Sequence, residues 1–530
     1  MLASPDAKIR DCTARGWWGS ETLDDLLRRT VAEVPGRTAV VDAPNRASFT
    51  DGAPRRLTYL ELDGLVDAVA ARLLEGGVGR DDVVLIQMPN VAEMLATLLA
   101  CARIGAIASP VAVQYREHEL AHIVGLLQPR AWVTVSRVGK FRAAALARAL
   151  VAAASASSVA TAASAPAAVA PAPAAAACRV VAWGDDLPPG VDSMNDVAAA
   201  PAATARVAAH LAGGRPSAND VFTICWTSGT EARPKGVPRS HNHWLAIGRI
   251  VATTPDLRDG EVLMGPFPMV NMASIGGVLL PWFLRRATVV LHHPFDLPTF
   301  LAQVAAERVT YTVAPPAVLT LLLQQPELMA KFDLSSLRNV CSGSAPLAPW
   351  MVQGWQRDHG ICVVNFFGSN EGVALASSGL DVPDAEERAR FFPRFGVPGL
   401  HWTADPVISL ESRLVDPASG EPVTAPGREG ELRIRGATVF DGYYGEPELT
   451  RRAFDDDGWF RTGDLFVIAG DGPQPRFYQF VGRCKEIIIR GGQNISPAEV
   501  EGLIEGHPAI AEAACVGVPD ETYGERVCVV

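Results

Sequence analysis

The chain has 530 residues, of which 48% are hydrophobic and 20% are charged, and its formal net charge at pH 7 is -11. This composition is typical of a soluble globular protein with ample apolar material for a large core, and the length suggests about three domain-sized units. The negative charge argues against a general affinity for nucleic acid or anionic membranes. Any anionic ligand must therefore be held by a local cluster of donors.

The nine cysteines and the N-terminal residues indicate a compartment. The cysteines are scattered and include no CxxC pair, a spacing that suits neither a disulfide framework nor a zinc site. The first residues, MLASPDAKIRDC, lack the apolar core of a signal peptide. We therefore expect a cytoplasmic protein.

The first predicted elements alternate between helix and strand. Residues 57–77 have apolar side chains at helical spacing and end at Gly-Gly, 82–89 form an apolar run closed by proline, and 90–105 are helical again. Residues 106–113 are another strand candidate. Strands that alternate with helices predict βαβ units and a mostly parallel sheet.

An alanine-rich stretch follows at 152–177, within an uncharged run from Arg148 to Arg179. Spanning a bilayer takes about 20 strongly apolar residues in a helix, and this stretch is weakly apolar and interrupted by prolines. We therefore expect a disordered low-complexity insertion on the surface, near residues 150–177.

The alternation resumes after this stretch. Further strands are predicted at 178–184, 221–230, 287–293, 309–316, 337–347 and 361–372. The last two each run into a turn of small residues, SGSAPL and FFGSNEG. In open α/β sheets, ligands gather where such turns leave the carboxyl ends of strands.

Beyond about residue 400 the strands become shorter and are separated by turn residues. Residues 412–423, 430–440 and 476–483 predict a β-rich subdomain. Residues 486–508 then predict a strand, a glycine turn and a helix, since Ser496-Pro497 suits an N-cap followed by the first helical position.

The stretch TSGTEARPKG, which follows the strand at 221–230, has the composition of a polyphosphate site. It offers hydroxyl donors, glycines that let the backbone approach a ligand, and one lysine as a mobile positive charge. These residues are Thr227, Ser228, Gly229, Thr230, Lys235 and Gly236. The stretch is not a Walker A motif, because the lysine precedes glycine. A surface loop rich in turn residues is the alternative.

The order and content of the later motifs resemble the adenylate-forming superfamily, which includes acyl-CoA synthetases, aryl-acid and amino-acid adenylation domains, and beetle luciferases. The resemblance begins near residue 59 and includes the TSGTEARPKG stretch, SGSAPL, FFGSNEG, GELRIRGATVFDGYY, GWFRTGDL and GRCKEIIIRGGQNISPAEVE. It therefore covers nearly all of the chain except the alanine-rich stretch.

The resemblance implies an α/β fold and a reaction in two steps. A large N-terminal AMP-binding domain of parallel βαβ sheets plus a β-rich subdomain would occupy 1–481, and a small α+β domain would begin at 482. A carboxylate would attack the α-phosphorus of ATP, with Mg²⁺ present, and release pyrophosphate. The thiol of coenzyme A, or of a carrier-protein phosphopantetheine, would then take the acyl group. Such catalysis is mostly positioning and electrostatic stabilisation.

The resemblance also implies a triphosphate site. Lys235 would hold the β- and γ-phosphates together with Thr227, Ser228, Gly229 and Thr230. Glu371 and Thr230 would hold Mg²⁺, which favours a carboxylate together with phosphate oxygens; a helix-start carboxylate is the alternative for Glu371. Asn370 stands beside the α-phosphate, where the family usually has threonine.

An adenosine site is implied as well. Phe367 would stack on adenine, with an ordinary core position as the alternative. Asp464 would accept hydrogen bonds from both ribose hydroxyls, with a solvated turn aspartate as the alternative. Arg483 would lie near ribose and phosphate and, with Lys235 and Glu371, is a predicted catalytic residue. The rest of the lining would be Gly343, Ser344, Ala345, Pro346 and Gly368.

The remaining implied residues concern the acyl group and the thiol. An apolar acyl pocket that would suit a hydrophobic, alicyclic or aromatic acid would be formed by Asn271, Met272, Ile275 and Gly276. Lys485 would be the hinge of the small domain, since a long charged side chain can stay solvated in both arrangements. Gly491 and Gly492 would line the path of the pantetheine arm.

Three departures from the family pattern bear on activity. Glu231-Ala232 replaces the usual Thr-Gly, and Asn271 stands where many acyl-CoA synthetases have histidine. In the family the small domain continues past the position of Val530, to a lysine that contacts the acyl carboxylate. We therefore expect a truncated sequence or impaired adenylation, since one lost donor can lower the rate by about 10²–10³.

Three functions stay open at this point. The first is an acid–CoA ligase, and the second is an adenylating enzyme that loads a carrier protein. Both thiols are pantetheine arms, so the residues do not separate these two. The third is a nucleotide-binding relic without catalysis, because a fold alone does not fix a function.

Overall fold

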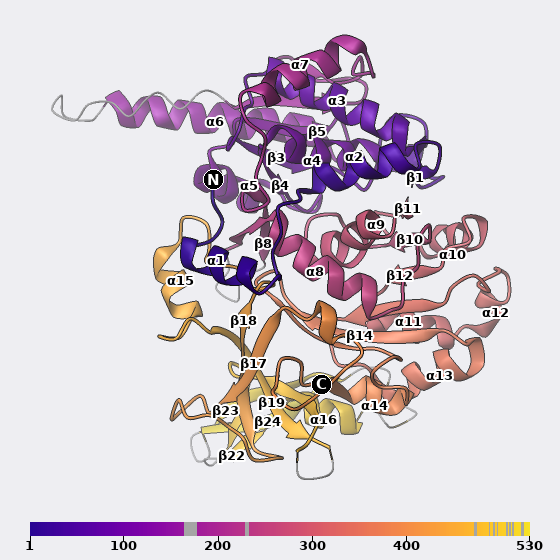
Figure 1. The fold of residues 1–530 in the computed structure, drawn as a ribbon, viewed down its shortest axis with the longest axis vertical. Coiled ribbons are helices and arrows are strands. Elements are labelled where there is room, and N and C mark those ends of the chain that lie inside the picture. The colour runs from indigo at the N-terminus through magenta and orange to yellow at the C-terminus, as the bar shows by residue number, and fades with distance from the viewer. Residues whose placement is uncertain are drawn as a thin grey trace.

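The structure is a computed structural model of the whole chain, and it describes residues 1–163, 178–227, 233–470, 474–486, 488–490, 493–495, 497–504, 507, 510, 513–520 and 524–530. Within these residues the strands form four sheets. Figure 1 shows the N-terminal helices α3 (Tyr59–Glu75) and α7 (Pro201–Ala212) at one end of the long axis, and the small C-terminal sheet at the other. The α/β fold predicted from the sequence is confirmed.

The first sheet has the strand order β7-β6-β5-β3-β4-β8-β9. Its strands are β3 (Val83–Gln87), β4 (Ile107–Pro110), β5 (Ala131–Val135), β6 (Arg179–Trp183), β7 (Asp192–Ser193), β8 (Val221–Thr227) and β9 (Lys235–Ser240). They run parallel except for the antiparallel pair β8 and β9. The other helices of this region are α4 (Ala92–Ile104), α5 (Glu117–Leu127) and α6 (Ala143–Ala163). The βαβ pattern predicted for this region is therefore confirmed.

The second sheet has the order β15-β14-β13-β12-β10-β11-β1-β2. Its strands are β1 (Thr38–Val41), β2 (Arg56–Thr58), β10 (Val262–Gly265), β11 (Thr288–Leu291), β12 (Tyr311–Val313), β13 (Asn339–Gly343), β14 (Cys362–Gly368) and β15 (Val373–Ser377). Strands β1 and β10 to β14 are parallel, and the two edge strands are antiparallel.

The remaining helices of residues 1–407 come before, between or after the strands of this second sheet in the sequence. They are α1 (Asp6–Ala14), α2 (Leu23–Glu33), α8 (His241–Thr253), the π-helix η2 (Met272–Leu279), α9 (Leu280–Leu284), α10 (Leu297–Ala306), α11 (Pro316–Leu323), α12 (Pro326–Met329), α13 (Pro349–His359) and α14 (Ala385–Arg390), with short 3₁₀ turns η1 (Arg46–Ser48) and η3 (Asp405–Val407). One continuous hydrophobic cluster contains buried residues of both large sheets, such as Val84 and Leu263. The two sheets therefore share a core.

The region beyond residue 400 contains the predicted β-rich subdomain. Its sheet has the order β16-β20-β19-β18-β17. The strands are β16 (Phe391–Pro393), β17 (Leu410–Val415), β18 (Glu429–Gly436), β19 (Phe460–Ala469) and β20 (Phe477–Arg483), with helix α15 (Pro447–Ala453) between β18 and β19. A fourth sheet, β22-β21-β24-β23, follows at the C-terminal end. It comprises β21 (Ile488–Arg490), β22 (Gln493–Ile495), β23 (Cys515–Asp520) and β24 (Gly524–Val529), with helix α16 (Pro497–Ile504).

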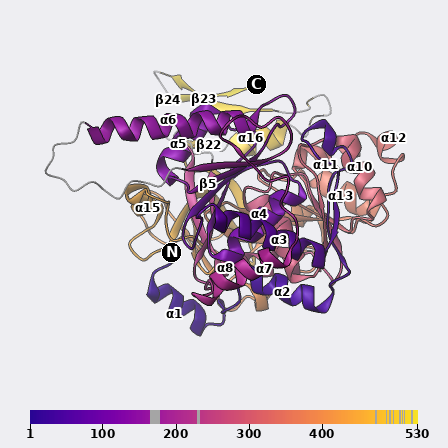
Figure 2. The ribbon, with the colours of Figure 1, turned by 90° about the horizontal axis from the view of Figure 1, so that it is seen from above.

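The alanine-rich stretch is only partly as predicted. Helix α6 is assigned as far as Ala163, twelve residues into the stretch that was expected to be disordered. Alanine has the highest helix propensity of all residues, and the first proline of the stretch, Pro166, comes after the helix. Figures 1 and 2 both show α6 extending outward from the body of the molecule. Residues 164–177 lie outside the described part. Among the described residues, no helix combines the length and apolar character needed to cross a bilayer.

Strand β13 is paired so closely with β14 that its last residue has to be glycine. A Cβ atom on Gly343 would lie 2.2 Å from the carbonyl oxygen of Phe366, its partner in the parallel register. We expect Gly343→Ala to lower the free energy of unfolding by about 1–3 kcal/mol, because strands must separate to make room. Gly125→Ala, on α5, is the matched control, since a Cβ there meets nothing within 4 Å. Urea unfolding measures both, and an unchanged midpoint for Gly343→Ala would contradict the expectation.

Candidate functional site

Tyr443 brings the predicted phosphate-binding lysine and the predicted metal-binding carboxylate together. Lys235 begins β9, opposite Thr227 at the end of β8, and its Nζ lies 5.4 Å from the centre of the Tyr443 ring. The Tyr443 hydroxyl donates a hydrogen bond to Oε1 of Glu371 at 3.0 Å. Glu371 lies in the turn between β14 and β15, so the alternative of a helix-start carboxylate is wrong. One tyrosine therefore links the lysine at the β8–β9 hairpin to the carboxylate after β14.

Asn370 joins three segments of the chain. Its side-chain nitrogen donates to the carbonyl oxygen of Trp226 at 3.1 Å, one residue before Thr227. Its side-chain oxygen accepts from the backbone N–H of Met272 at 2.9 Å. The carboxamide nitrogen has a second hydrogen, so this side chain can connect β8 to η2 and still donate to a ligand.

A buried arginine lies under the turn that carries Glu371. Arg239, on β9, donates from Nε to the carbonyl oxygen of Asn370 at 2.8 Å and from Nη1 to that of Thr438 at 2.9 Å. Burial lowers the pKa of this guanidinium to about 10, although the nearby Glu371 carboxylate opposes that shift. Arg239 therefore fixes the backbone on both sides of the site and remains a cation at neutral pH.

Phe367 lies in a cluster of aromatic rings. The ring is half-buried, and its centre is 5.0 Å from that of Phe466 on β19 and 6.2 Å from that of Phe392 on β16. These contacts join the end of β14 to the third sheet. They fit a core position, while the exposed part of the ring leaves one side for a ligand.

Asp464 lies on β19, two residues from Phe466. Its side chain is 18% exposed, so the alternative of a solvated turn aspartate is wrong. Arg483 is its partner in the β19–β20 register, with Nε 3.4 Å from Oδ1 of Asp464. Burial raises the pKa of the Asp464 carboxyl to about 6, and the Arg483 charge only partly opposes this. Phe466, two residues along β19 from Asp464, contacts Phe367 at the end of β14, the strand that precedes the Glu371 turn.

The turn after β13 has an unusual backbone. Ser344 has a φ of +74°, which non-glycine residues adopt only a few per cent of the time. Such conformations cluster at functional sites. Ser344, Ala345 and Pro346 are exposed, and so is Gly368 at the end of the neighbouring strand. The structure therefore leaves these predicted lining residues open to a ligand.

The predicted acyl-pocket residues form the beginning of η2. Asn271 is the N-cap, and its side-chain oxygen accepts from the backbone N–H of Ala273 at 3.2 Å. Ile275 is fully buried in the large hydrophobic cluster. A Cβ on Gly276 would lie 2.6 Å from the sulfur of Met272, so methionine covers this glycine. In this structure the segment is packed closely against itself and the core.

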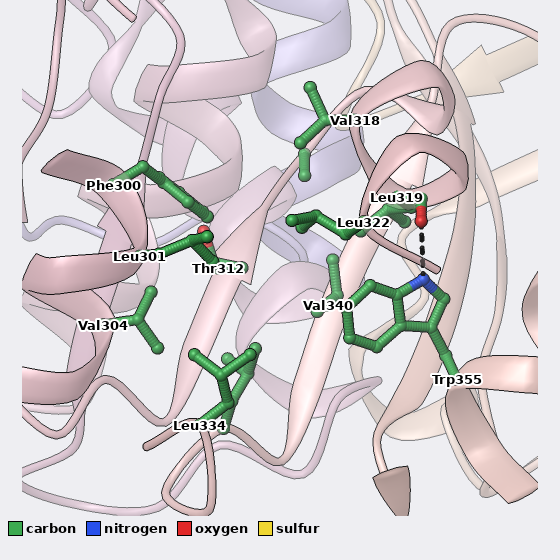
Figure 3. Close-up of a pocket in the computed structure, with 12 residues that line it drawn as sticks. Phe300, Leu301, Val304, Thr312, Val318, Leu319, Leu322, Leu334, Val340 and Trp355 are labelled. Carbon is green, nitrogen blue, oxygen red and sulfur yellow. Dashed lines mark hydrogen bonds between the residues drawn. The ribbon is translucent and has the colours of Figure 1, made fainter. Parts of the chain in front are cut away.

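A cavity between α10, α11, α13 and the second sheet lies elsewhere (Figure 3). The twelve residues that line it include Phe300, Leu319, Val340 and Trp355, and none of the predicted site residues. Its space amounts to about 10 Å³, which is about the minimum for one water molecule. This cavity is therefore no acyl pocket.

The residues present fit a magnesium ion bound mainly through phosphate. Among the described residues no group of three or more His, Cys, Asp and Glu side chains could hold a metal ion. Mg²⁺ usually keeps several waters and takes one or two carboxylates plus substrate phosphates. The half-buried Glu371 suits this pattern, because a carboxylate offers about four lone-pair sites and the Tyr443 hydroxyl takes one of them.

Several predicted residues cannot be placed. Ser228, Gly229, Thr230, Gly491 and Gly492 lie outside the described residues, as does Glu231-Ala232. Lys485 is described and exposed. It lies between β20 and β21, which belong to different sheets.

Tyr443 and Arg239 were not among the predicted site residues. Tyr443 lies within the motif GELRIRGATVFDGYY. Its role depends on the turn that brings it to Glu371, and no local sequence pattern predicts that contact. For Arg239 a signal was present, because a lone arginine in the strand Lys235–Ser240 has to be paired when the strand is buried.

Two family models match the chain. One, described as AMP-binding enzyme, matches residues 27–444, and one described as AMP-binding enzyme C-terminal domain matches residues 499–530.

Relatives and a solved structure agree with these matches. The medium-chain fatty-acid–CoA ligase of Escherichia coli (strain K12) is 30% identical over 522 residues, which cover 97% of this chain and 81% of that protein. The feruloyl-CoA synthase of an Amycolatopsis species is 32% identical over 471 residues, covering 88% of this chain and 82% of that protein. The apo structure of MbtA from Mycobacterium smegmatis has a TM-score of 0.72 at 26% identity, covering 100% of this chain and 88% of that chain.

Proposed function

Since this chain belongs to the AMP-binding enzymes, we propose that it is an ATP-dependent acid–CoA ligase. It activates a carboxylic acid as an acyl-adenylate with release of pyrophosphate, and then transfers the acyl group to coenzyme A. One observation carries this proposal. The Lys235 ammonium group lies over the Tyr443 ring, and the Glu371 carboxylate accepts a hydrogen bond from the hydroxyl of the same tyrosine. A cation and a carboxylate that contact the same tyrosine suit a magnesium-bound triphosphate.

We propose the following roles for the residues of the site. Lys235 stabilises the charge that develops on the leaving pyrophosphate, and Glu371 would hold Mg²⁺, which would neutralise phosphate charge when bound. Thr227, at the end of β8, donates its hydroxyl to the phosphates, together with the hydroxyls of Ser228 and Thr230 and the backbone N–H of Gly229. Asn370 donates to the α-phosphate from its second amide hydrogen.

The adenosine and acyl groups are assigned in the same way. Phe367 stacks on adenine beside the exposed turn at Ser344, and Asp464 and Arg483 hold the ribose. We assign the acyl group to the beginning of η2, at Asn271, Met272, Ile275 and Gly276, a segment that has few polar groups and is closely packed in this structure. Lys485 is the proposed hinge between residues 1–481 and the small domain, and Gly491 and Gly492 lie on the pantetheine path.

The scarcity of polar groups at the beginning of η2 supports a hydrophobic substrate. The names of two relatives point the same way, since one is a medium-chain fatty-acid–CoA ligase and the other a feruloyl-CoA synthase. We therefore propose a hydrophobic, alicyclic or aromatic acid as the substrate class.

The test is to incubate the protein with Mg·ATP, a panel of carboxylic acids and coenzyme A, and to follow acyl-CoA and AMP by mass spectrometry. We expect AMP and acyl-CoA in equal amounts with apolar acids and little product with amino acids. A parallel reaction contains a holo carrier protein in place of coenzyme A. Product with the carrier alone would contradict coenzyme A as the acceptor.

Acidification should weaken nucleoside binding through Asp464. A protonated carboxyl group accepts fewer hydrogen bonds from ribose hydroxyls. Burial raises the pKa of this group to about 6, so the charged form prevails above that pH and is lost below it. The Kd for adenosine, which carries no phosphate of its own, should rise about tenfold from pH 7.5 to about pH 5. Isothermal titration of the Asp464→Asn variant should show no such dependence. An equal rise in the variant would contradict the assignment.

A further inference from the structure

The segment of residues 437–444, between β18 and α15, touches the site at three points. The Tyr443 hydroxyl donates to Oε1 of Glu371, and the backbone N–H of Phe440 donates to the Glu371 carbonyl oxygen at 2.9 Å. The backbone N–H of Tyr444 donates to the carbonyl oxygen of Gly236 at 2.8 Å, next to Lys235. The 437–444 segment therefore contacts both the carboxylate turn and the lysine strand.

Asp441 anchors the middle of this segment. Its carboxylate accepts from Ser4 Oγ at 2.5 Å and from Lys8 Nζ at 2.8 Å, both from the N-terminal residues, and it lies 3.3 Å from Nε2 of His243 on α8. Nδ1 of His243 accepts from the backbone N–H of Ser240, so the hydrogen of the neutral ring is on Nε2, beside the carboxylate. Asp441 thus joins the segment to two helices that come from distant parts of the sequence.

The charges of this anchor persist at neutral pH. Burial alone would raise the pKa of Asp441, but the Lys8 charge and the nearby His243 ring lower it to about 2. Burial lowers the pKa of His243 to about 4. The anchor therefore consists of a carboxylate, an ammonium group and a neutral imidazole.

The N-terminal residues also hold the backbone of the segment. Lys8 Nζ donates to the carbonyl oxygen of Val439 at 2.7 Å, and Trp18 Nε1 donates to that of Ala437 at 3.3 Å. Figure 1 shows α1 beside the region that follows β18. Ser4 and Lys8 precede the region 27–444 that the family model matches, whereas His243 and Asp441 lie within it.

We propose that Tyr443 is a positioning residue for Glu371, and that Asp441 keeps Tyr443 in place by tying the 437–444 segment to α1 and α8. The Tyr443 hydroxyl fixes the rotamer of the carboxylate, which then presents its remaining lone pairs to a divalent cation on the nucleotide. Loss of such an outer hydrogen bond typically costs 10–100-fold in metal affinity. This inference rests on the proposed function, because it assumes that Glu371 binds the metal of Mg·ATP.

The test measures metal affinity directly in the full chain. Binding of Mn²⁺ in the presence of ATP is followed by electron paramagnetic resonance, and ATP binding in EDTA by isothermal titration. Tyr443→Phe keeps the ring under Lys235 and removes the hydroxyl, so the Kd for Mn²⁺ should rise about tenfold while metal-free ATP binding stays unchanged. Tyr444→Phe, the neighbouring tyrosine, is the matched control and should change neither value.

The outcomes separate this inference from the proposed function. A folded Tyr443→Phe variant with an unchanged Kd for Mn²⁺ overturns the positioning role. Wild-type protein that binds ATP but shows no binding of Mn²⁺ in the presence of ATP overturns the positioning role as well, together with the metal role of Glu371. Normal metal binding in wild-type protein without acid-dependent catalysis contradicts only the proposed function.

The anchor is tested by a double-mutant cycle. Lys8→Met removes the charge that holds Asp441 and keeps the apolar stem, and it should raise the Kd for Mn²⁺ in the wild-type background. It should add nothing in the Tyr443→Phe background, because residues that act as a unit are not additive. Arg10→Met, an exposed position on the same helix, is the control. No effect of Lys8→Met alone, or fully additive effects, would overturn the anchoring role of Asp441.

Discussion

Replacing Lys235 with alanine is expected to lower the rate of acid-dependent ATP–pyrophosphate exchange by about 10²–10³. Adenylation moves negative charge onto the leaving pyrophosphate, and Lys235 is the cation at the hairpin where we propose the triphosphate lies. A preorganised charge that meets developing charge stabilises the transition state more than the bound ATP. The rate constant should therefore fall more steeply than the affinity for ATP.

The control for this variant is Lys140→Ala, which removes an exposed lysine from the first half of the chain. It should leave the exchange rate unchanged. Thermal melting of both variants tests whether the fold is intact, and Lys235→Ala should melt close to the wild type because its side chain is half-buried at the start of a strand. A folded Lys235→Ala variant with a wild-type exchange rate would contradict the phosphate role of Lys235.

Replacing Glu371 with alanine should abolish the dependence of exchange on magnesium. Mg²⁺ favours carboxylate and phosphate oxygens, and without Glu371 the ion has only the phosphates and water as ligands. We expect a fall of about 10²–10³ in rate and a residual rate that no longer rises as Mg²⁺ is titrated. The measurement is pyrophosphate exchange over a range of Mg²⁺ concentrations at fixed ATP.

The matched control is Glu421→Ala, an exposed carboxylate on the turn after β17. It should keep both the rate and the magnesium titration of the wild type. Magnesium-dependent exchange that survives in Glu371→Ala with an unchanged midpoint would show that another group holds the ion, and would remove Glu371 from the proposed site.

The elements of the first sheet were predictable because local pattern and tertiary role agree. Residues 90–105 have helical apolar spacing with glycine as the stop, and α4 ends at Ile104 with Gly105 in the left-handed conformation. Residues 82–89 are mostly apolar, and within them Val83–Gln87 form the fully buried strand β3. By contrast, the alanine-rich stretch at 152–177 gave conflicting signals, because its composition favours disorder while alanine has the highest helix propensity.

The candidate site was predictable only in part. Its residue types follow from the chemistry of phosphate, and the structure places Lys235 and Glu371 on the same tyrosine. Contacts made between distant segments did not follow from the sequence. The carboxamide of Asn370 bridges Trp226 and Met272, and Asp441 is held by residues more than 400 positions away in the sequence, at Ser4 and Lys8. Local spacing carries no information on such pairs, because they depend on how segments far apart in the sequence pack together.

Exchange of radiolabelled pyrophosphate into ATP is the most direct measurement of carboxylate activation by this chain. It reports only the formation of the acyl-adenylate. It therefore does not depend on the acceptor thiol, or on the arrangement that the small domain would adopt for transfer to that thiol. We expect exchange that requires Mg²⁺, rises with a medium-chain or aromatic carboxylic acid, and is absent without any acid. Protein that binds Mg·ATP yet supports no exchange with any acid of the panel would contradict adenylation, and would leave a nucleotide-binding protein without catalysis.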